Sequence, residues 1–125
     1  MAPISVTLTR RDPPTAVVAL VGEHDPYSSE RLENELAVLL EEGQRIVVDL
    51  RDTEFIDSTT LSALLSARHQ AEDGELGFAL VLPEGDHSQV HQILSITGLD
   101  SAFAIYEKLE DALAAVHRGL TAKAA

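Results

Sequence analysis

The sequence predicts a single α/β domain in which an N-terminal β-hairpin leads into a mostly parallel sheet of about five strands, with about four helices. Its 125 residues are the size of one domain, and a hydrophobic fraction of 45% is enough to build a core. Short apolar runs alternate with longer segments whose leucines recur at helical spacing. No linker, internal repeat or low-complexity stretch interrupts residues 1–125. We therefore expect a core over about residues 4–118 and a flexible C-terminal tail over about 119–125.

The first two expected strands form the hairpin. Ile4, Val6 and Leu8 alternate with polar residues, which is the period of a half-buried strand. Asp12-Pro13-Pro14 then forces a turn. Residues 16–21 are continuously apolar, which predicts a second strand covered on both faces.

A helix and a third strand follow the hairpin. Asp25 before Pro26 is typical of a helix N-cap with proline in the first turn. The helix is expected to end near Gly43, and its buried face carries Leu32, Leu36, Leu39 and Leu40. Residues 46–50 form a short strand, after which we expect residues 51–54 to cross the end of the sheet.

A second helix is expected after residue 57. Phe55 and Ile56 should return the chain to the core, and all four residues of Asp57-Ser58-Thr59-Thr60 carry side chains that can cap a helix. Its buried and boundary face carries Leu61, Leu64, Leu65 and Arg68. Asp73-Gly74 ends it.

The C-terminal part continues the alternation. Residues 77–82 form a fourth strand stopped by Pro83, and a third helix after Asp86 ends at Thr97-Gly98. Residues 102–106 fit a short edge strand. A final helix carries Leu109, Ala112, Leu113 and Val116. The order β-β-α-β-α-β-α-β-α implies parallel strands joined by right-handed crossovers after the hairpin.

Charge and composition exclude several classes of function. The chain has 9 Lys+Arg against 21 Asp+Glu, a formal net charge of −12. This argues against binding nucleic acid or an anionic membrane, because both need a basic surface, and it favours a basic protein partner. The absence of cysteine excludes disulfides, thiolate zinc sites and cysteine nucleophiles. Because the sequence shows no secretory signal and no apolar run near ~20 residues, we expect a cytoplasmic protein with no direct membrane insertion.

Cofactor motifs are missing from the sequence. Neither a G-x-G-x-x-G after a strand nor a G-x-x-x-x-G-K-[ST] occurs. Residues 69–107 hold seven acids and no Lys or Arg, which leaves little to bind an anionic substrate. His87 and His91 stand four apart on the expected third helix beside Asp86, but no third metal ligand is evident. We expect no cofactor, no metal and no enzymatic activity.

Two groups of residues still invite a catalytic interpretation. His24 between Glu23 and Asp25 suggests acid–base chemistry, although a turn closing the second strand explains these residues equally well. Ser58 at a helix start could use backbone amides as an oxyanion hole, but the G-x-S-x-G elbow is missing. A small-ligand-binding or catalytic α/β protein using His24, Asp25 and Ser58 is therefore one alternative.

An acid followed directly by three hydroxyls, at residues 57–60, is the most unusual feature of the chain. Plain helix capping is one interpretation. The other is a phosphorylation switch, because a phosphoserine adds roughly −1.5 to −2 charge at neutral pH. From Glu23 to Asp57 there are eleven acids and three arginines, a local balance of −8. A phosphate in this acidic field would upset the fit to a basic partner surface and switch binding off.

Three segments resemble the STAS domains, and within that family the small anti-sigma factor antagonists of bacteria. Val21-Gly22-Glu23-His24-Asp25 is similar to the family's G-E-[LI]-D turn. Residues 46–50, followed by Phe55-Ile56-Asp57-Ser58-Thr59-Thr60-Leu61, resemble its strand and D-S-[ST]-G-L phosphorylation loop. Ile96-Thr97-Gly98-Leu99, with Phe103-Ala104-Ile105-Tyr106 beyond, is similar to its C-terminal signature. The resemblance spans residues 4–118.

The resemblance implies a single STAS-like domain that binds an anti-sigma factor with serine kinase activity and so releases a sigma factor. Phosphorylation of the serine after the loop aspartate switches it off, and by position that serine is Ser58. A serine phosphatase is a further implied partner. The expected partner-binding residues are Glu23, His24, Asp25, Tyr27, Asp57, Ser58, Thr59, Thr60 and Ser62.

The loop departs from the family pattern at two positions. Thr60 stands where the family usually has glycine, and Ser62 replaces a common second glycine. A side chain at residue 60 is expected to limit how closely a partner backbone approaches, and Thr59 and Thr60 become alternative phosphate acceptors. The alternative within the fold is a constitutive adaptor subunit of a transporter or stressosome-like complex, in which Ser58 only caps the helix. The oligomeric state stays open.

Overall fold

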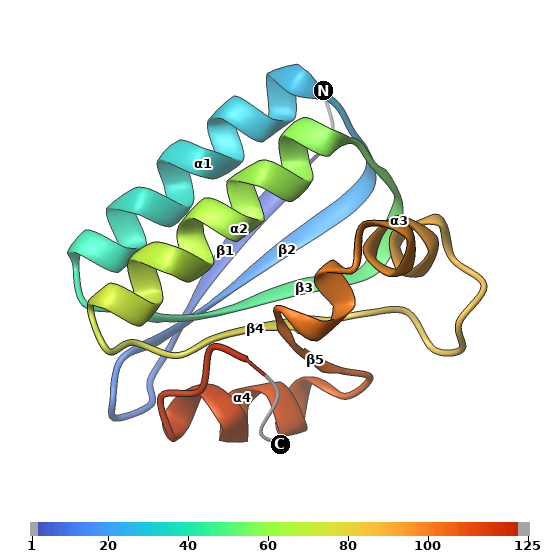
Figure 1. The fold of residues 1–125 in the computed structure, drawn as a ribbon. Coiled ribbons are helices and arrows are strands. Elements are labelled where there is room, and N and C mark those ends of the chain that lie inside the picture. The colour runs from blue at the N-terminus through green and yellow to red at the C-terminus, as the bar shows by residue number, and fades with distance from the viewer. Residues whose placement is uncertain (1–2, 123–125) are drawn as a thin grey trace.

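A mixed five-stranded sheet forms the middle layer of the protein (Figure 1). The computed structural model describes residues 3–122. The strands lie side by side in chain order, namely β1 (Ile4–Thr9), β2 (Thr15–His24), β3 (Arg45–Ile56), β4 (Phe78–Val81) and β5 (Ala104–Tyr106). β1 is antiparallel to β2, and each later neighbouring pair is parallel. The expected hairpin and mostly parallel sheet are confirmed.

Helices cover both faces of the sheet. They are α1 (Pro26–Glu41), α2 (Ser58–Asp73), α3 (Gln89–Thr97) and α4 (Leu109–His117), and a 3₁₀ turn spans Leu99–Ser101. α1, α2 and α3 lie on one face and α4 on the other (Figure 1). The core is divided accordingly into a larger cluster under α1 to α3 and a smaller one under α4. Among the described residues, no helix is long and apolar enough to cross a membrane.

The hairpin strands are less covered than their sequences suggest. Ile4 packs on the larger core cluster, but Val6 is 38% and Leu8 57% exposed, so the expectation of a half-buried first strand was wrong. β1 is the edge strand, and α1 lies over β2 and β3 instead. Residues 16–21 are not covered on both faces as expected, because α4 packs mainly on β3 to β5 and leaves Val21 exposed.

β3 is much longer than expected. It spans 12 residues and continues through 51–54, so these residues do not cross the end of the sheet. β2 and β3 remain paired, with two register shifts, as far as the pair His24 and Ile56. Ile56 is buried as expected, but Phe55 is 43% exposed, because successive strand residues point to opposite faces. The expected return of Phe55 to the core was wrong.

The third helix begins later than expected. Its N-cap is Ser88, whose hydroxyl accepts the His91 N–H, so α3 starts at Gln89 and His87 lies before it. Gly98, in the left-handed region with φ 75°, ends α3 as expected.

The chain after α4 returns to the sheet. The carbonyl oxygens of Leu120 and Thr121 accept hydrogen bonds from the Phe78 N–H (2.9 Å) and the Arg68 Nε–H (3.2 Å). The rest of the expected flexible tail, residues 123–125, lies outside the described residues.

Candidate functional site

The carboxyl ends of β2 and β3 place two helix starts beside each other. His24 pairs with Ile56 in the sheet, and the residues that follow, Asp25 and Asp57, are the N-caps of α1 and α2. α1 and α2 also pack against each other (Figure 1). The expected Asp25 cap is confirmed, and of the four candidate caps at residues 57–60 it is Asp57 that caps α2. Parallel pairing brings the Glu23 to Tyr27 turn next to the turn at Ser58.

Asp25 fixes the first of these turns. Its Oδ1 accepts the N–H groups of Tyr27 and Ser28 at 3.1 Å, and the Ser28 hydroxyl accepts the Asp25 N–H at 3.0 Å. This reciprocal capping box satisfies backbone donors that a helix start otherwise leaves unpaired. The Asp25 carboxylate is therefore engaged in structure at the start of α1.

Asp57 fixes the second turn through a single oxygen. Asp57 Oδ1 accepts the Thr60 N–H at 2.9 Å and the hydroxyls of Thr59 and Thr60 at 2.7 and 3.1 Å. Burial raises the pKa of the Asp57 carboxyl, but these hydrogen bonds outweigh burial and hold the pKa below its ordinary value. Asp57 is therefore an ionised cap at neutral pH.

The three hydroxyls after Asp57 have different surroundings. Ser58 is exposed at the first position of α2, and its hydroxyl forms no hydrogen bond with any residue in 3–122. Thr59 is exposed but donates to Asp57, whereas Thr60 is 0% exposed and faces inward. Of the four residues expected to be able to cap α2, only Asp57 does so, which leaves Ser58 accessible to a partner.

Gln89 is a residue of this region that the sequence did not reveal. Its Oε1 accepts the Ile56 N–H and its Nε2 donates to the Ile56 carbonyl, both at 2.9 Å. β4 pairs with β3 only as far as Asp49, so the last part of β3 lacks a strand on that side. The Gln89 amide takes the place of a strand there and holds the backbone directly before Asp57. A lone glutamine in a polar turn carries no sequence signal for this role.

His24 lies beneath the site rather than on it. It is fully buried, its Nε2 is 3.2 Å from the Val21 carbonyl oxygen, and its Nδ1 has no partner among the described residues. Burial lowers the pKa of His24 below its ordinary value, against the opposing effects of the Val21 carbonyl and Asp25. His24, Asp25 and Ser58 form no hydrogen bonds with one another in residues 3–122, so no catalytic relay is assembled.

The remaining expected residues are exposed at the same end of the molecule. Tyr27 is 82% exposed on the first turn of α1, and Glu23 is exposed at the end of β2. Ser62 is exposed one turn after Ser58 on the same side of α2. The structure thus separates an accessible set, Glu23, Tyr27, Ser58, Thr59 and Ser62, from a buried pair, His24 and Thr60.

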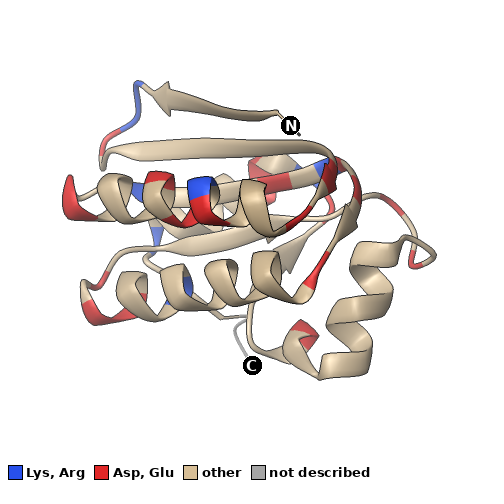
Figure 2. Ribbon diagram, turned by 90° about the horizontal axis from the view of Figure 1, so that it is seen from above, with Lys and Arg blue, Asp and Glu red and all other residues tan. Residues whose placement is uncertain are grey.

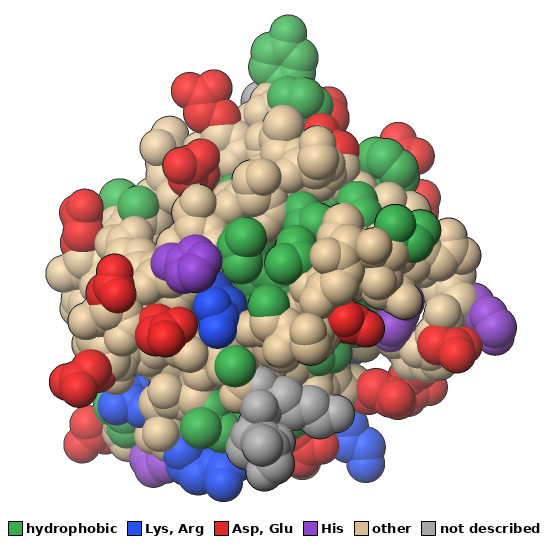
Figure 3. Space-filling model, viewed as in Figure 1, with side chains coloured by type: hydrophobic (Ala, Val, Ile, Leu, Met, Phe, Trp, Pro, Cys, Tyr) green, Lys and Arg blue, Asp and Glu red, His purple; other side chains and the backbone are tan. Residues whose placement is uncertain are grey.

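The acidic residues do not gather in one field. Glu41 and Glu42 lie at the far end of α1, whose 16 residues extend about 24 Å. Asp49 is paired with Arg51 at 2.8 Å. On the α1–α3 face, acidic side chains are spread around the outline (Figure 3). The acidic field at Ser58 is therefore smaller than the local balance of −8 suggests.

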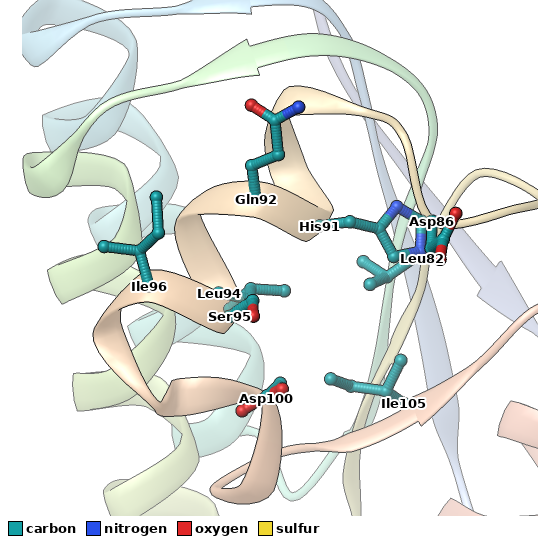
Figure 4. Close-up of a pocket in the computed structure, with 9 residues that line it drawn as sticks. All are labelled: Leu82, Asp86, His91, Gln92, Leu94, Ser95, Ile96, Asp100 and Ile105. Atoms are coloured by element: carbon teal, nitrogen blue, oxygen red, sulfur yellow. The ribbon is translucent and has the colours of Figure 1, made fainter.

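The two histidines near α3 contact different residues. His87 Nε2 contacts the Asp86 carboxylate at 3.2 Å, and His91 Nδ1 contacts the Ser88 hydroxyl at 2.6 Å. No group of three potential ligands occurs among residues 3–122. His91 and Asp86 instead lie on one side of a cleft of about 590 Å³ between α3 and β4–β5, whose floor is apolar (Figure 4). The residues that line it are Leu82, Asp86, His91, Gln92, Leu94, Ser95, Ile96, Asp100 and Ile105.

Comparisons with known proteins agree on one family. The family model described as STAS domain matches residues 7–112. The anti-sigma-F factor antagonist RsfB of Mycobacterium tuberculosis is 30% identical over 120 residues, which cover 94% of this chain and 95% of that protein. A crystal structure of an anti-sigma factor antagonist from Mycobacterium paratuberculosis matches with a TM-score of 0.75 at 28% identity, covering 92% of this chain and 95% of that one. The Bacillus cell fate determinant SpoIIAA in its phosphorylated form shares the fold, with a TM-score of 0.65 at 18% identity over 90% of this chain and 97% of that one.

Proposed function

The chain belongs to the STAS domain family, and from that premise we propose that it is an anti-sigma factor antagonist switched off by phosphorylation of Ser58. Unmodified, it binds a cytoplasmic anti-sigma factor and so releases the sigma factor. The anti-sigma factor acts as a serine kinase on its bound antagonist, and a serine phosphatase restores binding. Relatives named anti-sigma factor antagonists, and a neighbour of the same fold in a phosphorylated form, support this proposal.

The state of the Ser58 hydroxyl is the observation that carries the proposal. It is exposed and unbonded among the described residues, and the cap of α2 is supplied by Asp57 instead. A kinase can therefore engage Ser58 without uncapping α2. In the transfer, the Ser58 oxygen bonds to the γ-phosphorus of ATP, the bond to ADP breaks, and the hydroxyl proton is released. Burial and the bond to Asp57 make Thr60 a much poorer acceptor.

The proposed contact surface is the accessible set around Ser58. Tyr27 offers a large exposed ring, a residue type that often anchors interfaces. Glu23 and the net charge of −12 favour a basic partner surface. His24 and Thr60 lie beneath this surface, and the half-exposed Asp57 shapes the turn at Ser58. Because its side chain faces inward, Thr60 does not hold a partner backbone away from the loop.

Phosphate added to Ser58 weakens binding through charge. It places roughly −1.5 to −2 charge beside the ionised Asp57, and the N-terminus of α2 offsets this only partly. The partner surface fits a neutral Ser58 near the capping carboxylates of Asp25 and Asp57. After phosphorylation, it meets a bulky dianion at the centre of the contact.

The test uses an anti-sigma factor captured with the unmodified protein. The pair is incubated with ATP, and intact masses are compared for wild type, Ser58→Ala and Thr59→Ala. One phosphate is expected on wild type and Thr59→Ala, and none on Ser58→Ala. Calorimetry of the phosphorylated product should then show weakened binding. If Ser58→Ala is still phosphorylated, the phosphate acceptor is another residue. If wild type takes up no phosphate, the proposed phosphorylation switch is refuted.

A further inference from the structure

The outer edge of β1 presents unpaired backbone groups at alternate residues. The Val21 N–H donates to the Pro3 carbonyl at 3.3 Å, so positions 3 and 21 are a hydrogen-bonded pair of the antiparallel ladder. Such pairs alternate along the ladder, so the N–H and C=O groups of Ile4, Val6 and Leu8 point away from β2. Arg31, whose Nη2 lies 3.5 Å from the Ile4 carbonyl oxygen, contacts this outer side. No strand among the described residues pairs with it.

The same edge carries exposed apolar side chains. Val6 and Leu8 share the sheet face of Ile4, which packs on the larger core cluster. The Arg31 contact shows which side of α1 faces β1, and Val38, seven residues later, lies on that side. Because α1 and β1 run in the same direction, Val38 comes beside Leu8. Val6, Leu8 and Val38, at 38%, 57% and 51% exposure, thus border the unpaired backbone.

Apart from the Arg31 contact with the Ile4 carbonyl, none of the usual protections against strand pairing occurs on this edge among the described residues. Natural edge strands carry charges, prolines or bulges that prevent another chain from pairing. Residues 4–9 contain no charge and no proline, and β1 pairs with β2 without a register shift. Figure 2 shows β1 as an uncharged outermost ribbon, with basic residues in the turn that follows its carboxyl end. In a chain of net charge −12, this edge is where two copies can approach with little repulsion.

We propose that β1 pairs antiparallel with β1 of a second copy, forming a two-fold dimer with a continuous sheet through both molecules. A two-fold axis at Val6 sets Val6 opposite Val6, and Ile4 opposite Leu8, of the two copies. All three positions have outward-pointing groups, so every facing pair exchanges two hydrogen bonds. The Ile4 carbonyl can keep its Arg31 contact, because an oxygen has two lone pairs. The exposed Val6, Leu8 and Val38 side chains of both copies become neighbours on one face.

A second copy suits this edge because the register is self-complementary. The same three residues supply both halves of the interface, which is the requirement for an isologous dimer. The Ser58 turn lies at the carboxyl end of β3, two strands away, so the proposed dimer leaves Ser58 uncovered. The inference is independent of the proposed function.

Light scattering after gel filtration tests the proposal with the full chain and no partner. Wild type should show twice the chain mass of 13.5 kDa and decline toward one chain mass on dilution. Leu8→Lys, which places a charge in the apolar border, and Val6→Pro, which removes an outward N–H, should each halve the mass. Thr7→Lys is the matched control, because it adds the same charge to the same strand on the opposite sheet face, and it should stay dimeric. Circular dichroism checks that each variant is folded.

Amide hydrogen exchange gives a second measurement that does not rely on substitution. In concentrated wild type, the N–H groups of Ile4, Val6 and Leu8 should exchange at least about tenfold more slowly than in the Leu8→Lys variant. A wild type that is monomeric at every concentration would overturn the proposal. So would a dimer whose mass Leu8→Lys and Val6→Pro both leave unchanged, or large aggregates with no discrete dimer.

Discussion

The side-chain amide of Gln89 forms two hydrogen bonds with the backbone of Ile56, both 2.9 Å long, and so joins the start of α3 to the residue before the α2 cap. A carboxamide presents one acceptor and one donor side by side, as a neighbouring strand does. The backbone that leads into Ser58 is thus held by a side chain 33 positions later in the sequence. The accessibility of Ser58 therefore depends on α3 as well as on Asp57.

Replacing Gln89 by leucine should destabilise the protein and loosen the Ser58 turn. The change leaves the N–H and C=O of Ile56 unpaired, which costs about 1–3 kcal/mol. Urea unfolding measures the loss, and amide exchange at Ile56 should become faster. Gln92→Leu is the matched control, because Gln92 is exposed on the same helix and makes only one long contact, 3.5 Å from the His87 carbonyl. Equal stability of the two variants would contradict the assigned role.

The unfolding free energy should fall as pH is lowered from about 7.5 to about 5.5, in part because of His24. Burial lowers the pKa of His24 in the folded protein, so the unfolded chain binds the proton first as pH falls through about 6.5. Protonation in the fold would also leave a buried Nδ1–H unpaired. His24→Gln keeps a donor near the Val21 carbonyl and should flatten the pH dependence. His69→Gln, at an exposed position of α2, should retain it, and equal slopes for both variants would refute the assignment.

Ser58→Asp should weaken binding of the anti-sigma factor by about tenfold or more, which is about 1.4 kcal/mol. The new carboxylate lies beside Asp57 at the centre of the proposed contact, while its position at the helix start keeps α2 stable. Calorimetric titration gives the affinity. Ser66→Asp is the control, because Ser66 is exposed two turns further along α2 and receives the same charge. An affinity for Ser58→Asp equal to wild type would count against the switch.

Gly77→Ala should destabilise the fold by about 1–3 kcal/mol, because there is no room at residue 77 for a side chain and the added methyl group overpacks the contact. A Cβ at residue 77 would lie 2.5 Å from the backbone Cα and carbonyl oxygen of Val116 in α4. The backbone of α4 would have to shift away from the sheet. At Gly74 an added Cβ meets its nearest atom at 3.5 Å, so Gly74→Ala should be tolerated. Thermal unfolding of the two variants separates these outcomes.

The features that the sequence predicted best are those determined by residues a few positions away in the chain. Asp25 and Asp57 cap helices through contacts two or three residues away. The sequence therefore identified Asp25 and narrowed the second cap to residues 57–60. Gly98 ends α3 for an equally local reason, its left-handed backbone. The fold class followed from the alternation of such segments.

The features that the sequence could not predict are those that depend on how helices and strands pack against one another. Val6 and Phe55 are apolar and were expected to be buried. However, α1 packs mainly over β2 and β3 rather than over the edge strand, and Phe55 points to the sheet face opposite Ile56 and α1 to α3. Thr60 was expected to offer an accessible hydroxyl, but in the first turn of α2 its side chain points inward and is fully buried. The Gln89 to Ile56 contact joins segments that only the crossover from β3 to β4 brings together.

The 82% exposure of Tyr27 gives the protein an intrinsic optical reporter at the start of α1. The chain has no tryptophan and two tyrosines, and the second, Tyr106, is half-buried against the α4 cluster at a different part of the fold. Fluorescence from Tyr27 can therefore be isolated by a Tyr106→Phe substitution, without a dye or an added cysteine. Events at the start of α1 can then be followed in real time through the one remaining phenol ring.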